Sequence, residues 1–122
     1  MIEASCHCGN IKITVPETTE TVTSCNCSIC SKYASLWAYF SPKNVNITTT
    51  ENAIASYCWG DKTIEFHHCN NCGCLTHYTP MKLGNKNKMA VNFRLVSATV
   101  VSSLKTRYFD GADTWAEIEP RK

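Results

Sequence analysis

Short runs in which apolar and polar residues alternate dominate the chain and predict β-strands. In residues 10–15 every second position is apolar, and the run ends before Pro16. Further runs rich in β-branched and aromatic residues cover residues 37–40, 54–59, 63–67, 75–78 and 88–93. Turn signals separate the runs, and Gly60-Asp61 between two of them predicts a hairpin turn. The pattern therefore predicts a mainly β, largely antiparallel fold.

Helical periodicity is scarce in this sequence. Residues 28–33 predict one or two helical turns with Ser28 as the N-cap, and residues 42–45 predict another short turn. The stretches 16–21 and 46–53 are expected to be long irregular connections. A fold with so little helix to brace it would gain part of its stability from bound metal.

Length and charge narrow the class of protein. The 122 residues contain no linker, internal repeat or composition break, which predicts a single domain over residues 1–122. The net charge of +2 comes from scattered Lys and Arg, a distribution that argues against a nucleic-acid partner. No apolar run approaches the ~18 residues of a membrane-spanning helix, so no membrane partner is expected.

Nine cysteines are far more than a core of this size requires. Such cysteines either cross-link a fold or bind metal. The first five residues lack the basic and apolar regions of a secretory signal, which predicts a cytoplasmic protein. Thiols stay reduced in the cytoplasm, and an odd number of cysteines leaves one over in any disulfide scheme. The cysteines are therefore predicted to be metal ligands.

Three cysteines within six residues, Cys25, Cys27 and Cys30, form the densest motif. Thiolates at this spacing can converge on one zinc ion and leave one position of its tetrahedron open. A zinc ion with an open position is typical of a catalytic site, whereas a closed site is structural.

Two other cysteine pairs each end in glycine, which suits the sharp turn of a zinc knuckle. Together they supply four thiolates for a closed structural zinc site: Cys6, Cys8, Cys69 and Cys72. The spacing leaves other arrangements open. Cys69 and Cys72 could complete the metal site of the three-cysteine motif instead. Other residues that could close that site are Cys58, Cys74, His67, His68 and His77.

The order of these motifs carries a family resemblance. C-x-C-G lies at residues 6–9, C-x-C-S-x-C at residues 25–30 and C-x-x-C-G at residues 69–73, and a closing segment Arg-Tyr-Phe-Asp-Gly lies at residues 107–111. Together they resemble the glutathione-dependent formaldehyde-activating enzyme family, which includes the centromere protein V group. Two positions depart from the family pattern: Ser31 stands where a basic residue is frequent, and Cys74 stands where another small residue is common.

The resemblance implies an Mss4-like (β-tent) fold of short antiparallel sheets, stabilised by two zinc ions per chain. It implies a structural zinc on the four knuckle cysteines and a catalytic zinc on Cys25, Cys27 and Cys30. The implied activity is that of a carbon–sulfur lyase that joins glutathione, or another small thiol, to formaldehyde. Lys32 and Arg94 are the candidate contacts for a substrate carboxylate, and Trp37, Tyr39 and Phe40 are candidate walls of a pocket.

Two other classes of function use the same residues. One is a non-catalytic, zinc-stabilised module that binds a protein partner, favoured by the missing basic residue after Cys30. The other is a zinc-thiolate protein for metal handling or redox response, favoured by the additional thiols of Cys58 and Cys74.

Overall fold

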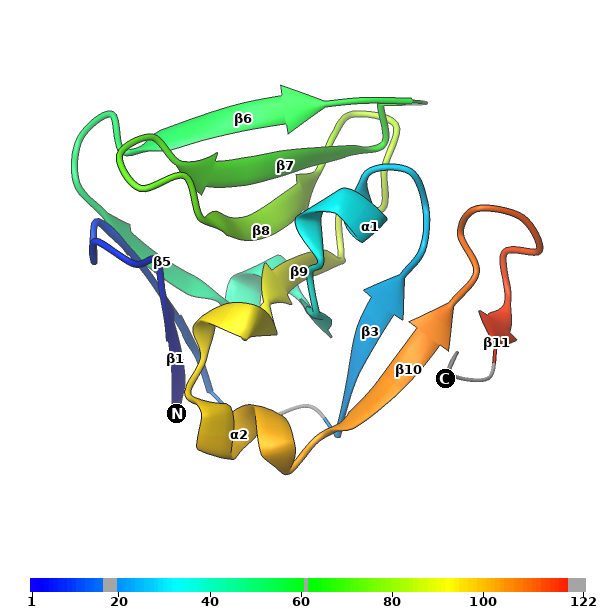
Figure 1. Cartoon of the computed structure of the whole chain (residues 1–122). Coiled ribbons are helices and arrows are strands. Elements are labelled where there is room, and N and C mark those ends of the chain that lie inside the picture. The colour runs from blue at the N-terminus through cyan, green and yellow to red at the C-terminus, as the bar shows by residue number, and fades with distance from the viewer. Residues whose placement is uncertain (17–19, 61, 119–122) are drawn as a thin grey trace.

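Two β-sheets make up most of the protein in a computed structural model that describes residues 1–16, 20–60 and 62–118 (Figure 1). The smaller sheet has the strand order β1-β2-β5, formed by Ile2–Ser5, Ile11–Val15 and Asn46–Thr49. The larger sheet has the order β11-β10-β3-β4-β9-β8-β7-β6. Its strands are β3 (Thr21–Cys25), β4 (Trp37–Phe40), β6 (Ile54–Cys58), β7 (Ile64–Cys69), β8 (Leu75–Pro80), β9 (Met89–Asn92), β10 (Lys105–Phe109) and β11 (Glu117–Ile118). The mainly β, Mss4-like architecture predicted from the sequence is confirmed.

Most neighbouring strands are antiparallel, and β3 with β10 is a parallel pair in the described part of the chain. Tyr108 of β10 lies opposite Ser24, and Phe109 lies opposite Cys25. A parallel pair needs a long crossover connection. Here that connection contains every described element from Cys30 to Ser102, so the closing segment of the chain returns beside the first strand of the larger sheet (Figure 1).

Residues 46–53, expected to be irregular, begin with a strand instead. Asn46–Thr49 forms β5 and pairs antiparallel with β2, with Ile47 opposite Ile13. Polar Asn and Thr side chains give this segment little apolar alternation, but β-branched Thr suits an edge strand. The predicted turn at Gly60-Asp61 includes residue 61, which lies outside the described residues. The two strands that this turn would join pair as expected, with Cys58 opposite Glu65.

The helices are short. They are α1 (Cys30–Tyr33), α2 (Ala98–Ser102) and the 3-10 turns η1 (Pro42–Asn44) and η2 (Phe93–Leu95). The prediction of Ser28 as a cap is wrong, because Ile29 occupies the N-cap position of α1 and its side chain makes no capping hydrogen bond. The sequence analysis did not predict α2, whose N-cap Ser97 accepts a hydrogen bond from the Val100 N–H. No helix in the described ranges is long and apolar enough to cross a membrane.

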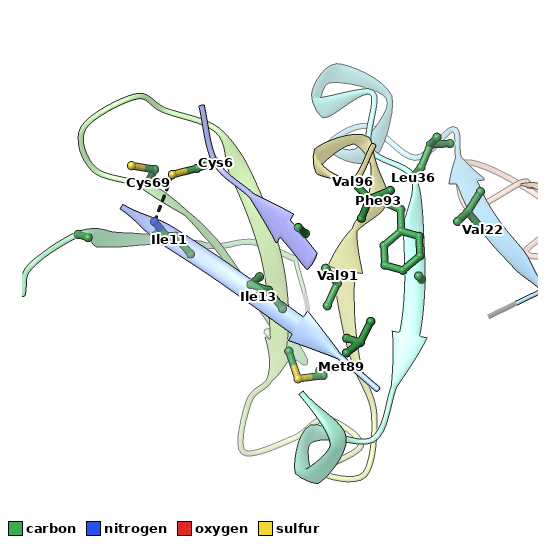
Figure 2. Packing of buried hydrophobic residues seen from close by; sticks show 14 residues of the cluster. Cys6, Ile11, Ile13, Val22, Leu36, Cys69, Met89, Val91, Phe93 and Val96 are labelled. Carbon is green, nitrogen blue, oxygen red and sulfur yellow. Dashed lines mark hydrogen bonds between the residues drawn. The ribbon is translucent and has the colours of Figure 1, made fainter. Parts of the chain in front are cut away.

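Strand β4 divides the interior because its side chains alternate between the two faces of the sheet. Ala38 and Phe40 face an aliphatic core that also contains Ile13 of β2 and Val91 of β9. Figure 2 shows Ile11 and Ile13 of β2 on one side of this core and Val91 and Phe93 on the other. This face holds the two sheets together.

The other face of the larger sheet carries a separate aromatic cluster. Trp37 of β4 packs against Tyr78 at 4.8 Å between ring centroids and against Phe66 at 6.0 Å. Cys30 belongs to this cluster, and Cys25 and Cys27 pack at its border. The three-cysteine motif is therefore placed on the aromatic face, away from the contact between the sheets.

Candidate metal centres and the cavity beside them

The first candidate metal centre joins the turn after β1 to the turn between β7 and β8. Cys6 and Cys8 come from the first turn, Cys69 ends β7, and Cys72 lies in the second turn. The four Sγ atoms all lie within 4.8 Å of one another. The Sγ of Cys8 is 3.7 Å from that of Cys6 and 3.6 Å from that of Cys69. The fold therefore groups Cys69 and Cys72 with the N-terminal pair and not with the three-cysteine motif.

The surroundings of this centre fit a metal held by thiolates. The N–H of Ile11 donates to the Cys6 sulfur at 3.2 Å, at the start of β2 (Figure 2). The N–H groups of Asn71 and Cys72 both donate to the Cys69 sulfur at 3.4 Å. Hydrogen bonds of this kind stabilise the charged form of a thiol. Burial raises the pKa of Cys6 to about 11, whereas backbone N–H groups lower the pKa of Cys72 to about 5. A dication would offset the repulsion among four adjacent thiolates, and this donor set suits zinc.

The second candidate centre, here called the triad, consists of Cys25, Cys27 and Cys30. Cys25 ends β3, Cys30 begins α1, and Cys27 lies in the loop between them. The three Sγ atoms lie within 4.8 Å of one another. The N–H of Cys27 donates to the Cys25 sulfur at 3.5 Å, and the N–H of Cys30 donates to the Cys27 sulfur at 3.4 Å. The triad thus offers three sulfur ligands to one ion.

The electrostatics of the triad also fit bound metal. Burial raises the pKa of Cys30 well above its ordinary value, and the indole N–H of Trp37 opposes that rise. The Nε1 of Trp37 is buried and makes no hydrogen bond of ordinary geometry within the described structure. A deprotonated Cys30 sulfur would give this buried donor an acceptor. Burial raises the pKa of Cys25. Burial also acts to raise the pKa of Cys27, but several hydrogen bonds, the largest from the Cys30 N–H, together outweigh it and lower that pKa.

In the described part of the chain, no further metal-binding side chain joins the triad. The residues considered for this role were Cys58, Cys74, His67, His68 and His77. The Cys58 thiol contacts the sulfur of Met81 at 3.1 Å, and Cys74 packs against the aliphatic core. The three sulfurs therefore leave one position of a tetrahedral site without a ligand from the described residues.

Two of the histidines are engaged with each other and with hydroxyl groups. His67 and His77 lie opposite each other on β7 and β8, with ring centroids 4.6 Å apart. The ring nitrogens of His67 contact the hydroxyls of Ser56 at 2.8 Å and Thr79 at 2.7 Å. Burial lowers the pKa of His77 to about 3, so this ring is neutral at physiological pH.

The closing segment of the chain fixes the loop of the triad. The N–H of Asn26 donates to the Phe109 carbonyl at 3.2 Å, which continues the pairing of β3 with β10. The Asn26 side chain donates to Asp110 at 3.0 Å and accepts from the Ala112 N–H at 3.1 Å. Hydrogen bonds from Asn26 and Thr114 lower the pKa of Asp110, which keeps this carboxylate ionised. The Phe-Asp-Gly segment thus holds the triad loop in place through these hydrogen bonds.

Gly111 lies directly against the triad. A Cβ atom added to Gly111 would lie 2.6 Å from the Cys25 sulfur and 3.2 Å from the Cys27 Cβ. No side chain fits at this distance unless a neighbour moves. The close approach explains why glycine follows Asp110 at this point of the chain.

A cavity of about 700 Å³ opens beside the triad. All three triad cysteines line it together with Trp37 and Tyr39, so two of the three aromatic residues proposed as its walls contribute to it. The third, Phe40, points to the opposite face of β4 and packs against Phe93 at 5.9 Å between ring centroids. The size is ordinary for a small-molecule site.

Two exposed tryptophans border the cavity from distant parts of the chain. Trp59 follows β6 and is 52% exposed, and Trp115 precedes β11 and is 71% exposed. Trp115 packs edge-on against Phe109 with centroids 5.1 Å apart. The sequence analysis did not single out either residue, because their positions beside the triad depend on strand pairing.

The cations near the cavity are not the two that the sequence singled out. Lys88 and Arg107 line the cavity, and Lys32 and Arg94 are not among its described lining residues. Lys32 is exposed on α1. The Nε of Arg94 donates to the Ala34 carbonyl at the C-terminal end of α1 at 2.9 Å. A substrate role for Lys32 and Arg94 stays a prediction.

The fold and the two centres together define a class: mainly β proteins in which two cysteine clusters are suited to hold metal ions and one cluster faces a cavity. The family model of the glutathione-dependent formaldehyde-activating enzyme matches residues 1–113. The chain therefore belongs to this family.

A solved structure shares the fold. The crystal structure of a Rhodobacter sphaeroides protein, determined as a structural genomics target, superposes with a TM-score of 0.70 at 20% sequence identity. The match covers 86% of this chain and 99% of the other. No curated protein matches the sequence significantly.

Proposed function

We propose that this protein is a zinc-dependent carbon–sulfur lyase that joins a small thiol, glutathione in the first instance, to formaldehyde. The observation that carries the proposal is the triad, whose three sulfurs converge beside a cavity without a fourth described protein ligand. Membership of the family supports the pairing of glutathione with formaldehyde. We further propose that residues 1–122 form one domain and that it works in the cytoplasm, where thiols stay reduced.

The two cysteine clusters would hold two zinc ions with different tasks. Cys6, Cys8, Cys69 and Cys72 form a closed set and would stabilise the fold by joining the β1–β2 turn to the β7–β8 turn. Cys25, Cys27 and Cys30 would hold the catalytic ion. Bound there, zinc supplies a Lewis acid that lowers the pKa of a thiol ligand from its free value of ~8.5.

The protein itself contributes orientation and shelter from water. Trp37, Phe66 and Tyr78 form a packed aromatic floor under the triad, and Trp59 and Trp115 border the opening. The reaction forms one bond between the thiol sulfur and the formaldehyde carbon. The thiol loses its proton and the former carbonyl oxygen gains one, which gives S-hydroxymethylglutathione without any oxidant. Holding the two reactants together is the largest contribution available to such an addition.

Because the uncatalysed addition is already fast, the test measures exchange at equilibrium. Magnetisation transfer between ¹³C-formaldehyde and S-hydroxymethylglutathione is recorded with and without the zinc-loaded protein. We expect the protein to raise the exchange rate and Cys27→Ser to abolish the increase while zinc content falls from two per chain to one. Cys58→Ser is the matched control and retains the activity.

Two outcomes contradict the proposal. An exchange rate equal to the background, with both metals bound, would instead favour a non-catalytic binding module. Loss of both metals in Cys27→Ser would mean that the triad is needed for folding.

A further inference from the structure

Positive charge gathers at the cavity beside the triad. Lys88 and Arg107 both line it, and none of its described lining residues is acidic. We propose that Lys88 and Arg107 form a carboxylate-binding site, so that the cavity selects thiols carrying two separated carboxylates. This inference rests on the proposed function, because it names the class of thiol that the triad would receive.

Lys88 is held at the cavity by an aromatic ring. It precedes β9, and its Nζ lies 4.1 Å from the ring centroid of Tyr39, which also lines the cavity. A cation over the face of a tyrosine ring is attracted by the negative charge of the ring's π electrons. This contact positions the ammonium group without neutralising it, so its charge remains available to a ligand.

Arg107 reaches the cavity from β10. Its Nε forms an ion pair with the carboxylate of Glu117 at 2.9 Å, which offsets part of its charge, and its Nη1 donates to the hydroxyl of Thr23 at 3.4 Å. These contacts fix the plane of the guanidinium and leave part of its donor set for a carboxylate. Burial raises the pKa of Tyr39, and Arg107 opposes this rise, so the positive charge of Arg107 acts on the same ring that Lys88 covers. Tyr39 thus lies under the influence of both cations.

The sheet order sets the distance between the backbone positions from which the Lys88 and Arg107 side chains extend. β10 and β9 are separated by β3 and β4, and three strand spacings amount to about 14 Å. An extended chain of three residues spans roughly 10 Å, and the long Lys and Arg side chains cover the remainder. A tripeptide thiol with a carboxylate at each end can therefore reach both cations, whereas a single amino acid such as cysteine reaches one.

The three tryptophans of the protein make this inference directly measurable. Trp37, Trp59 and Trp115 are the entire tryptophan complement, and all three line the cavity. Their fluorescence therefore reports a ligand in this cavity. The probe is S-methylglutathione, which keeps both carboxylates but has no free thiol, so binding is measured without chemistry at the triad.

We expect S-methylglutathione to bind the zinc-loaded protein and its diethyl ester to bind at least about tenfold more weakly. Lys88→Met and Arg107→Met should each weaken binding of the acid about fivefold and leave binding of the ester unchanged. Lys86→Met, in the loop before β9 and not among the lining residues, is the matched control and should bind as the wild type does. Affinity for the acid should also fall with added salt.

Arg107→Lys keeps the charge but loses the planar fork, and it replaces Arg107→Met if the latter fails to fold. Equal affinities for acid and ester, or undetectable binding of the acid at millimolar concentration, would overturn the inference. The same holds if Lys32→Met and Arg94→Met weaken binding while the cavity variants do not. Carboxylate-dependent binding without faster formaldehyde exchange would refute the proposed function alone, and faster exchange without carboxylate preference would refute this inference alone.

Discussion

Gly111→Ala is a small substitution that tests whether Cys25, Cys27 and Cys30 bind metal or are ordinary free thiols. The added Cβ would lie 2.6 Å from the Cys25 sulfur, 3.2 Å from the Cys27 Cβ and 3.4 Å from the Trp115 ring. The φ angle of Gly111 is not in the positive region, so the backbone accepts alanine without strain. The effect of the substitution is therefore confined to the atoms that the methyl group meets.

The energetic cost of the added methyl group depends on whether the Cys25 side chain is free to move. The sulfur must retreat by about 1 Å to reach ordinary contact with carbon. A free thiol does so by turning about one side-chain torsion, which costs of order 0.5–1.5 kcal/mol. The bond between zinc and a thiolate sulfur is about 2.3 Å long and tolerates a change of only about 0.2 Å. The same movement of a zinc-bound sulfur would therefore break this bond or strain the site. We expect zinc affinity at the triad to fall about 10–100-fold, with little loss of stability in the metal-free protein.

The assay is a competition titration of zinc-loaded protein with a chelator, which resolves a tight and a weakened site. Gly111→Ala should release one zinc per chain early and keep the other as the wild type does. In a Cys25→Ala background the shortest contact disappears and only those with the Cys27 Cβ at 3.2 Å and the Trp115 ring at 3.4 Å remain, so the double variant should be nearly as stable as Cys25→Ala alone. Release of both ions together, or wild-type affinity at both sites, would refute the placement of Gly111 against a metal ligand.

Two further predictions concern the remainder of the fold. His77 has a pKa of about 3 when folded and an ordinary pKa of 6.5, so the unfolded chain binds the extra proton and stability is lost as pH falls from 6.5 towards 3. The free energy of unfolding, measured in urea, should be lower at pH 5 than at pH 7, and His77→Gln should reduce this difference by about 2 kcal/mol. An unchanged difference would contradict the buried, neutral ring. Gly73 has a φ of 80° with open space around it, so the cost of a substitution comes from the backbone alone. Gly73→Ala should lower the free energy of unfolding by about 1 kcal/mol, and Gly73→Asn should lower it less. The same urea unfolding experiment measures both, with zinc retained at the triad. Equal stability of all three proteins would show that the knuckle turn does not require a left-handed residue.

Local patterns predicted the elements whose side chains alternate strongly. The strand at residues 11–15 was expected because large apolar groups occupy every second position, and the strand at residues 37–40 was expected because the run is rich in aromatic residues. The strand at residues 46–49 and the helix at residues 98–102 were not, because their short polar or β-branched sequences are equally compatible with loops. The strand at residues 46–49 forms because it pairs with β2, and this long-range pairing is not visible in any local sequence pattern.

The sequence by itself determined which side chains of this protein are suited to bind metal. Cysteines two or three residues apart can reach one ion because so short a chain keeps their sulfurs near one another, and the triad is the clearest case. Tertiary structure alone decided which pairs share a centre, because Cys69 reaches Cys8 only through the packing of the two sheets. It also decided which charges face the cavity. Lys88 directly precedes β9 and Arg107 lies on β10, and the sheet order brings both to one cavity, an order that no spacing along the chain records.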